Sequence, residues 1–241
     1  MTRKANTRLA GIVLAVTLIL LAAGLLAAGC GTKPLDVTFH FSDGPEGWQG
    51  YFAELPADYE QDVYELRFSH APAPIPGRQD KGLLLQGHNR SDDLFMFIAR
   101  KFGKEDGLKR RTTYTVRLSF DLATNVAPGL IGIGGSPGGS VYVKAGVVTS
   151  DPAPAVGGDG YYRVSFDKGN QTGGGNALVV LGNIEKTGSQ DDSYEYKSFQ
   201  HECEITTGDR AEAWVVIGTD SGFEGLTRLY YTNIRVTFVP R

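Results

Sequence analysis

The sequence has few of the residues that build disulfide frameworks and metal sites, with two cysteines and four histidines in 241 residues. Because Cys30 and Cys203 are the whole supply, no disulfide network and no cysteine metal site can form within the chain. The histidines are His40, His70, His88 and His201. They show neither the i,i+4 nor the His-x-His spacing of a zinc site. We therefore expect neither a cysteine metal site nor a histidine zinc site.

Motifs for phosphate binding and nucleophilic catalysis are also missing. The glycine-rich segment 129–139 lacks the spacing of a dinucleotide loop and the Gly-Lys-Ser/Thr ending of a P-loop. No Gly-x-Ser-x-Gly elbow is present. We therefore name no catalytic residue, and a Ser-His-Asp hydrolase stays open only because the members of such a triad lie far apart in a sequence.

Basic charge is scarce as well. The chain has 24 Lys and Arg against 27 Asp and Glu, a net charge of −3 at pH 7. Three of the basic residues and none of the acidic ones lie in residues 1–29, so residues 30–241 hold 21 against 27, a net charge of −6. A nucleic-acid partner requires a basic footprint, and we expect none here.

Helical apolar spacing is absent after residue 30, where alternating runs take its place. In Tyr114–Leu122, every second residue is apolar and the residues between them are polar, which is typical of an antiparallel strand with one buried face. Similar runs occupy 37–41, 63–68, 82–86, 94–99, 141–148, 161–166, 177–181, 213–217 and 229–238. Turn residues separate them, so we predict an all-β fold: an antiparallel β-sandwich, jelly-roll-like, formed by one domain over 36–241.

The N-terminus has the layout of a secretory signal peptide. Arg3, Lys4 and Arg8 precede an uncharged, mostly apolar run over 9–29, which ends at Cys30. We predict a signal-peptide helix over 1–29 and a short polar tether over 30–35. Two alternatives remain: an uncleaved membrane helix, because the run is long enough to span a bilayer, and ordinary secretion after cleavage at an alanine.

The residues Ala27-Ala28-Gly29-Cys30 resemble the lipobox of bacterial lipoproteins. The resemblance implies cleavage before Cys30 and lipidation of its thiol, hence an extracytoplasmic protein anchored to a membrane. Cys203 then has no partner within the chain. Alternation places Cys203 on one strand face with Phe199 and Ile205, which predicts a buried free thiol.

The first and last strands carry a second resemblance. The segments Val37–Trp48 and Leu229–Phe238 resemble the opening and closing strands of jelly-roll carbohydrate-binding modules, in the galactose-binding-like superfold. The resemblance implies glycan binding, although the superfold hosts many functions. It also implies a structural calcium held by acidic residues of these strands, but here Thr232 and Asn233 stand where the modules have Asp.

Two polar segments, 87–93 and 219–224, interrupt the predicted strands. Sugar recognition needs planar hydrogen-bonding groups and an aromatic face, which Trp48, Tyr51 or Phe223 could supply. The candidate ligand-binding residues are Trp48, His88, Asn89, Arg90, Asp92, Asp93, Asp220 and Glu224. Loops distant in sequence can gather at one end of a sandwich. Alternatively, each loop satisfies only its own backbone, or the carboxylates hold Ca²⁺.

These observations predict a membrane-tethered extracytoplasmic binding lipoprotein, with a glycan as the leading ligand. A structural lipoprotein that contacts another envelope protein is the alternative, and a hydrolase is the second alternative. Exposed aromatic side chains in a groove would favour the first, and a flat apolar patch would favour the second. A pocket that holds a histidine beside a serine or a carboxylate pair would favour the third.

Overall fold

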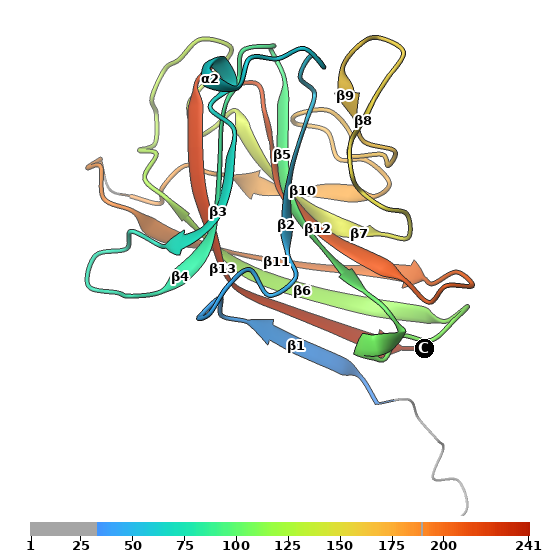
Figure 1. The fold of residues 1–241 in the computed structure, drawn as a ribbon. Helices are drawn as coiled ribbons and strands as arrows, with labels where there is room; N and C mark the ends of the chain where they lie inside the picture. The colour runs from blue at the N-terminus through green and yellow to red at the C-terminus, as the bar shows by residue number, and fades with distance from the viewer. Residues whose placement is uncertain (1–32, 189) are drawn as a thin grey trace, which may run out of the picture. The chain divides into compact units, whose positions relative to one another are not determined.

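Two antiparallel sheets form the body of the molecule in the computed structural model, which describes residues 33–188 and 190–241 (Figure 1). Residues 34–241 make up one unit. The predictions for the signal peptide and for Cys30 fall outside the described residues. No helix within the described ranges is long and apolar enough to cross a bilayer.

Sheet A has the strand order β11-β6-β13-β4-β3, and β1 also pairs with β13. Its strands are β1 (Leu35–Phe39), β3 (Arg67–Pro72), β4 (Lys81–His88), β6 (Thr113–Thr124), β11 (Glu195–Thr206) and β13 (Leu226–Pro240). Sheet B has the order β10-β7-β12-β5-β2. Its strands are β2 (Gln49–Ala53), β5 (Leu94–Phe102), β7 (Val141–Val148), β10 (Leu178–Asn183) and β12 (Ala213–Ser221).

Three small elements lie outside the two sheets. A short hairpin pairs β8 (Ala155–Val156) with β9 (Tyr162–Arg163). The helical elements are α2 (Gln61–Tyr64) and the 3-10 turn η1 (Lys104–Asp106). All pairings between the named strands are antiparallel, and the two sheets enclose one large apolar core, so the predicted antiparallel β-sandwich is confirmed.

The core follows from strand alternation on sheet A. In β6, Tyr114, Val116, Leu118, Phe120 and Leu122 are all buried, and the residues between them face outward. Sheet B differs, because β5 and β12 are buried on both faces. Strands of this kind read as continuous apolar runs, since each face packs against another layer.

The second layer on sheet B is the connection between β7 and β10, residues 149–177, here called the cover segment. It lies over the outer face of the sheet, where Phe95, Phe97 and Val216 belong to a second apolar cluster. The ring of Phe166 stands edge-on to those of Phe95 and Phe97, with centroids 6.4 and 6.0 Å away. Within the described ranges, sheet A has no equivalent cover on its outer face over β1, β6 and β11, whose outward side chains are mostly exposed or half-buried.

Some predicted strands were wrong in extent. The run 63–68 is not one strand, because α2 occupies 61–64, Glu65 leaves it at φ 49°, and β3 begins only at Arg67. The run 161–166 shrinks to the two residues of β9. The strand β2 was missing from the prediction, and β11 was indicated only by the alternation around Cys203. β2 is a five-residue edge strand that contains Gly50, and β11 carries a charged or polar residue at every second position.

Candidate functional site

The two polar segments of the sequence prediction lie together at one end of the sandwich. The Asn89 side-chain amide donates to the Ser221 carbonyl at 2.9 Å, and the Asn89 backbone N–H donates to the Gly225 carbonyl at 3.1 Å. Both loops leave their strands at this end because His88 of β4 pairs with Leu226 of β13, and Leu94 of β5 pairs with Ser221 of β12.

The loops do not form the open polar site that the sequence suggested. Asn89 and Asp220 are buried, and the amide of Asn89 is consumed in joining the loops. Asp92 occupies a turn at φ 67°, and its carbonyl accepts from the Gln171 side chain at 3.4 Å. Glu224 is exposed, and its backbone N–H donates to the Ile133 carbonyl.

His88 and Arg90 belong to a small surface group beside α2. His88 Nδ1 lies 2.9 Å from Glu65 Oε1, and Arg90 Nη2 lies 3.3 Å from the same imidazole nitrogen. Arg90 Nε is 3.5 Å from the Val63 carbonyl of α2. This group ties the β4–β5 loop to the helix.

Trp48 is a correction to the sequence analysis. Its side chain is only 1% exposed, and its ring packs edge-on against Phe39 in the core at a centroid distance of 5.6 Å. A ring enclosed on both faces has no surface for a sugar. Phe223 also packs inward, over Gly132 and Gly225. The third aromatic candidate, Tyr51, borders a hollow on the surface.

A buried cluster of charges occupies the place where the loops meet the cover segment. Lys144 Nζ of β7 donates to Asp220 Oδ2 at 2.7 Å and to the carbonyls of Lys168 and Gly173 at 2.9 Å each. The side chains of Lys144 and Asp220 are 0% exposed. Lys168 Nζ donates to the same Oδ2 at 3.0 Å, and the Gln171 backbone N–H also donates to it. Lys144 and Asp220 therefore hold the cover segment on the sheet.

A carboxyl pair completes this cluster. Burial, followed by the neighbouring charge of Asp220, raises the pKa of Asp93 to about 7. Burial opposes ionisation of Asp220 too, but the charges of Lys168 and Lys144 hold its pKa below the ordinary value. Among the described residues, Asp93 Oδ1 and Asp220 Oδ1 are buried oxygens without a hydrogen-bond partner, and the raised pKa of Asp93 favours its protonated form, which can donate a hydrogen bond.

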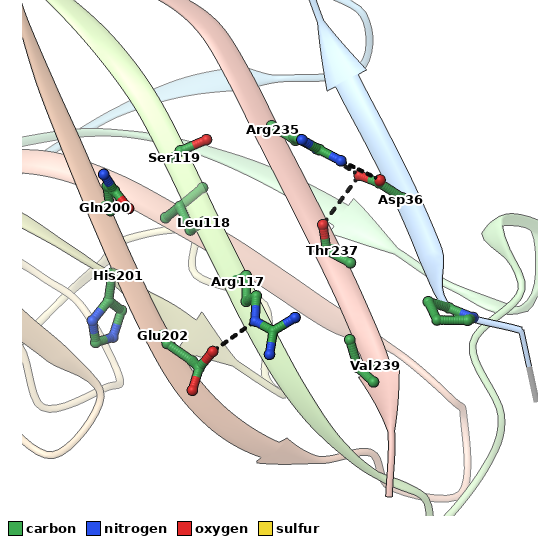
Figure 2. A pocket seen from close by; sticks show the side chains of 11 residues that line it. Asp36, Arg117, Leu118, Ser119, Gln200, His201, Glu202, Arg235, Thr237 and Val239 are labelled. Carbon is green, nitrogen blue, oxygen red and sulfur yellow. Dashed lines mark hydrogen bonds and ion pairs between the residues drawn. The ribbon is translucent and has the colours of Figure 1, made fainter.

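The outer face of sheet A carries a shallow groove of about 760 Å³ across β1, β13, β6 and β11 (Figure 2). Figure 2 shows Arg117 reaching Glu202 on β11, and Arg235 and Thr237 reaching Asp36 on β1. The charged side chains of these pairs are 42–63% exposed. Within the described part of the chain, the lining contains no Tyr, Phe or Trp.

His201 borders this groove, but its side chain is not positioned to act as a catalytic group in it. It alternates with Gln200 and Glu202 along β11, so its side chain leaves the opposite face of the strand. Burial lowers the pKa of His201, which favours the neutral imidazole. On the same strand, Cys203 is a free, half-buried thiol, and burial followed by the charge of Glu202 raises its pKa to about 11.

A second hollow, of about 210 Å³, lies at the outer edge of β2 and is here called the edge hollow. Half of its lining is aromatic, and the lining residues are Gly50, Tyr51, Phe52, Leu55, Tyr59, Leu66, Pro154 and Tyr162. Tyr51 stacks on Phe97 with centroids 5.1 Å apart, and Tyr59 meets Tyr162 edge-on at 6.3 Å. These contacts fix three half-exposed rings around one opening.

The polar groups of the edge hollow centre on Tyr51. Its hydroxyl donates to Oε1 of the exposed Gln49 at 2.6 Å. Burial, followed by the charge of Asp151, raises the pKa of Tyr51. The hollow thus combines apolar rings with a phenol and a neighbouring amide, groups by which pockets orient hydroxylated ligands.

The sequence analysis missed Tyr59 and Tyr162 as site residues, and Lys144 and Lys168 as partners of Asp220. Lys144 carried a detectable signal, since it is a single charge within the apolar run 141–148 and buried charges require a partner. Tyr59 and Tyr162 carried none, because the two rings are far apart in the sequence and meet only in the folded chain. No group of three or more His, Cys, Asp or Glu suited to a metal occurs in 33–188 or 190–241. The structural calcium stays a prediction.

Comparisons with known proteins identify structural neighbours only. No protein-family model and no curated protein matches the chain. The mannan-recognising module TmCBM27 has 14% identity and a TM-score of 0.41, over 85% of this chain and 98% of that one. The CBM22-1 xylan-binding domain of Paenibacillus barcinonensis Xyn10C has 10% identity and a TM-score of 0.41, over 89% and 99%.

A third neighbour is the Caldicellulosiruptor saccharolyticus module CBM27-1, solved with mannohexaose. It has 10% identity and a TM-score of 0.40, over 83% of this chain and 95% of that one. At such identities and TM-scores, a likeness does not transfer a ligand from one protein to another. The structural neighbours of this β-sandwich include carbohydrate-binding modules.

Proposed function

We propose that this protein is a non-catalytic glycan-binding module and that the edge hollow is its binding centre. One observation carries the proposal: Tyr51, Tyr59 and Tyr162 are half-exposed around a single opening. A sugar ring has apolar C–H faces and a rim of hydroxyls. Aromatic side chains cover such faces, and a few fixed polar groups orient the rim.

The size of the edge hollow suggests how much of a glycan it takes. Its volume of about 210 Å³ is below the roughly 300–1,000 Å³ of enclosed small-molecule sites. It therefore suits one ring, with the remainder of a longer chain lying over the surface. The Tyr51 hydroxyl and its partner Gln49 are the groups that would choose among hydroxyl patterns.

The test is calorimetric titration of the full-length protein in detergent against a panel of neutral and acidic oligosaccharides. For a ligand that binds, Tyr51→Ala and Tyr162→Ala should each weaken affinity roughly tenfold, about 1.4 kcal/mol. Tyr194→Ala is the matched control, because Tyr194 is a half-buried tyrosine that packs on Tyr230 of sheet A, outside the edge hollow. Equal losses in all three variants, or a panel without a ligand, would overturn the proposal.

We also propose that the module is held outside the cytoplasm by a lipidated Cys30, on the strength of the N-terminal sequence. Mass spectrometry of the membrane-extracted protein should find acylated Cys30 as the first residue. Cys30→Ala should release the protein or block its processing. Mature protein that still begins at Met1 would contradict this anchoring and leave the glycan proposal standing.

A further inference from the structure

The loop between β6 and β7 exposes apolar side chains that the proposed function does not use. Over residues 129–134, here called the aliphatic loop, Leu130, Ile131 and Ile133 are 44%, 97% and 72% exposed. Ile131 is the most exposed large apolar side chain among the described residues. Single exposed aliphatics are ordinary on protein surfaces, but three in four positions at a loop apex are not.

The aliphatic loop is held in place by its neighbours. The Ile133 carbonyl accepts a hydrogen bond from the Glu224 backbone N–H at 2.9 Å. Gly132 lies so close to Phe223 that a Cβ at this position would be 2.5 Å from the ring. At the base of the loop, the Ser140 backbone N–H donates to the Ser136 carbonyl at 3.0 Å. The exposed side chains are therefore presented on a fixed support.

The aliphatic loop carries no charge of its own, although two carboxylates lie at its ends. No Asp, Glu, Lys, Arg or His occurs in the sequence from Leu122 to Val143. The Gly129 backbone N–H donates to Glu185 Oε1 at 3.5 Å, and the exposed Glu224 lies beside Gly134. Charged groups are the costliest ones to bring into a membrane, and residues 129–134 contribute none. The Gly129 N–H and the Ile133 carbonyl are already hydrogen-bonded, which reduces the polar surface that a low-dielectric medium would leave unsatisfied.

The composition of the apex distinguishes between a lipid and a protein partner. Protein interfaces concentrate their binding energy in Trp, Tyr and Arg, and leucine is under-represented there. The aliphatic loop has none of those three residue types and projects as a tip. With a net charge of −6 over residues 30–241, the chain also gives no reason to expect preference for anionic lipids.

We propose that the aliphatic loop inserts Leu130, Ile131 and Ile133 into the interface of a lipid bilayer, as a second membrane contact independent of the N-terminal segment. Three side chains supply less apolar surface than an acyl chain does, so their role is to orient a domain that is held by other means. The proposal goes beyond glycan binding and does not depend on it.

The position of the aliphatic loop determines how its membrane contact would orient the domain. Leu35, the first residue of β1, pairs with Phe238, and Phe238 pairs with Val116 near the start of β6. The aliphatic loop follows the other end of β6, after Thr124. At about 3.3 Å per residue, the two points are roughly 25–30 Å apart along the strand. Contacts near both ends would lay the strands of sheet A along the bilayer.

The test places a tryptophan at the apex of the full-length protein in phosphatidylcholine vesicles. The native Trp48 and Trp214 are 1% and 9% exposed, so their emission is a constant background. Ile131→Trp should emit at shorter wavelength in vesicles than in detergent-free buffer, and brominated lipids should quench it. Val156→Trp is the matched control, because Val156 is an aliphatic residue of β8 that is 55% exposed.

The outcomes separate cleanly. Adding Ile133→Asp to Ile131→Trp should abolish both the shift and the quenching, because the new carboxylate cannot enter the lipid. Vesicles with added anionic lipid should give no further shift. A tryptophan at position 131 that stays water-exposed overturns the proposal, and so does one that is quenched no more than the tryptophan at position 156.

Discussion

The outer faces of the two sheets carry similar ion pairs in opposite surroundings. On sheet A, Arg235 and Asp36 join neighbouring strands with both side chains in water, 58% and 42% exposed. On sheet B, Lys144 and Asp220 do the same beneath the cover segment, with no exposure at all. Water competes for the first pair, whereas the loss of either partner of the second would leave a buried charge without its closest counter-ion.

The buried pair of Lys144 and Asp220 also shows how the cover segment is attached to sheet B. Its apolar contribution is small, since Val164, Phe166 and Ala177 are the residues that pack on the second cluster. Lys144 adds hydrogen bonds to two carbonyls of the cover segment, and Asp220 accepts from the Gln171 backbone. Polar contacts ordinarily contribute little net stability, but here they are buried, so their loss is costly.

The largest expected effect is that of Lys144→Met. The substitution leaves Asp220 buried without its closest cation, and we expect a loss of about 3–5 kcal/mol in the free energy of unfolding. Urea unfolding monitored by circular dichroism measures it. The double variant Lys144→Met/Asp220→Leu should recover part of the loss, since it removes both charges. A single variant as stable as the wild type would show that the buried pair does not hold the sheet and cover segment together.

Phe166→Ala should come next, with a loss of roughly 2–3 kcal/mol, because the half-buried ring fills the space above Phe95 and Phe97. The damage should be local to the cover segment. Limited proteolysis should cut the variant within 149–177 while the remainder of the sandwich stays intact. Unchanged resistance to cleavage would mean that the buried charges suffice to hold the cover segment.

The carboxyl pair predicts a pH dependence. The pKa of Asp93 is raised to about 7 in the folded protein, so its contribution to stability is complete below the unfolded value of about 3.9 and is lost as the pH rises through 7. Asp93→Asn should remove this decline between pH 4 and 8. Thermal unfolding at a series of pH values measures it. A variant with the same decline as the wild type would assign it to other groups.

The smallest effect should be that of Arg235→Ala on the open face. The pair with Asp36 stands in water, so we expect a change below about 1 kcal/mol that shrinks further in high salt. Arg117→Ala, which removes the pair with Glu202, should behave in the same way. If either cost approached that of Lys144→Met, burial would not be what distinguishes the two faces.

The sequence predicted what strand alternation determines, and little beyond it. The period-two pattern of Tyr114–Leu122 correctly gave the buried face of β6. It gave no sign that Trp48 points into the core, because one aromatic residue next to a glycine has no period. The loops around Asp93 and Asp220 do lie together, but Lys168 reaches them from a segment with no strand pattern. The edge hollow escaped prediction for a similar reason, since β2, Tyr59 and β9 meet only in the folded chain.

The arrangement of β13 has a consequence for how the protein is made. This strand pairs with β6, β4 and β1, so it joins the parts of sheet A to one another. Residues 226–240 are synthesised after every other strand of the sheet. Until they emerge, the strand edges of β6, β4 and β1 that pair with β13 in the folded protein have no partner. Such edges are templates for aggregation, and contacts this distant in sequence form slowly. A nascent chain of this topology therefore needs protection from contact with other chains until β13 has been synthesised.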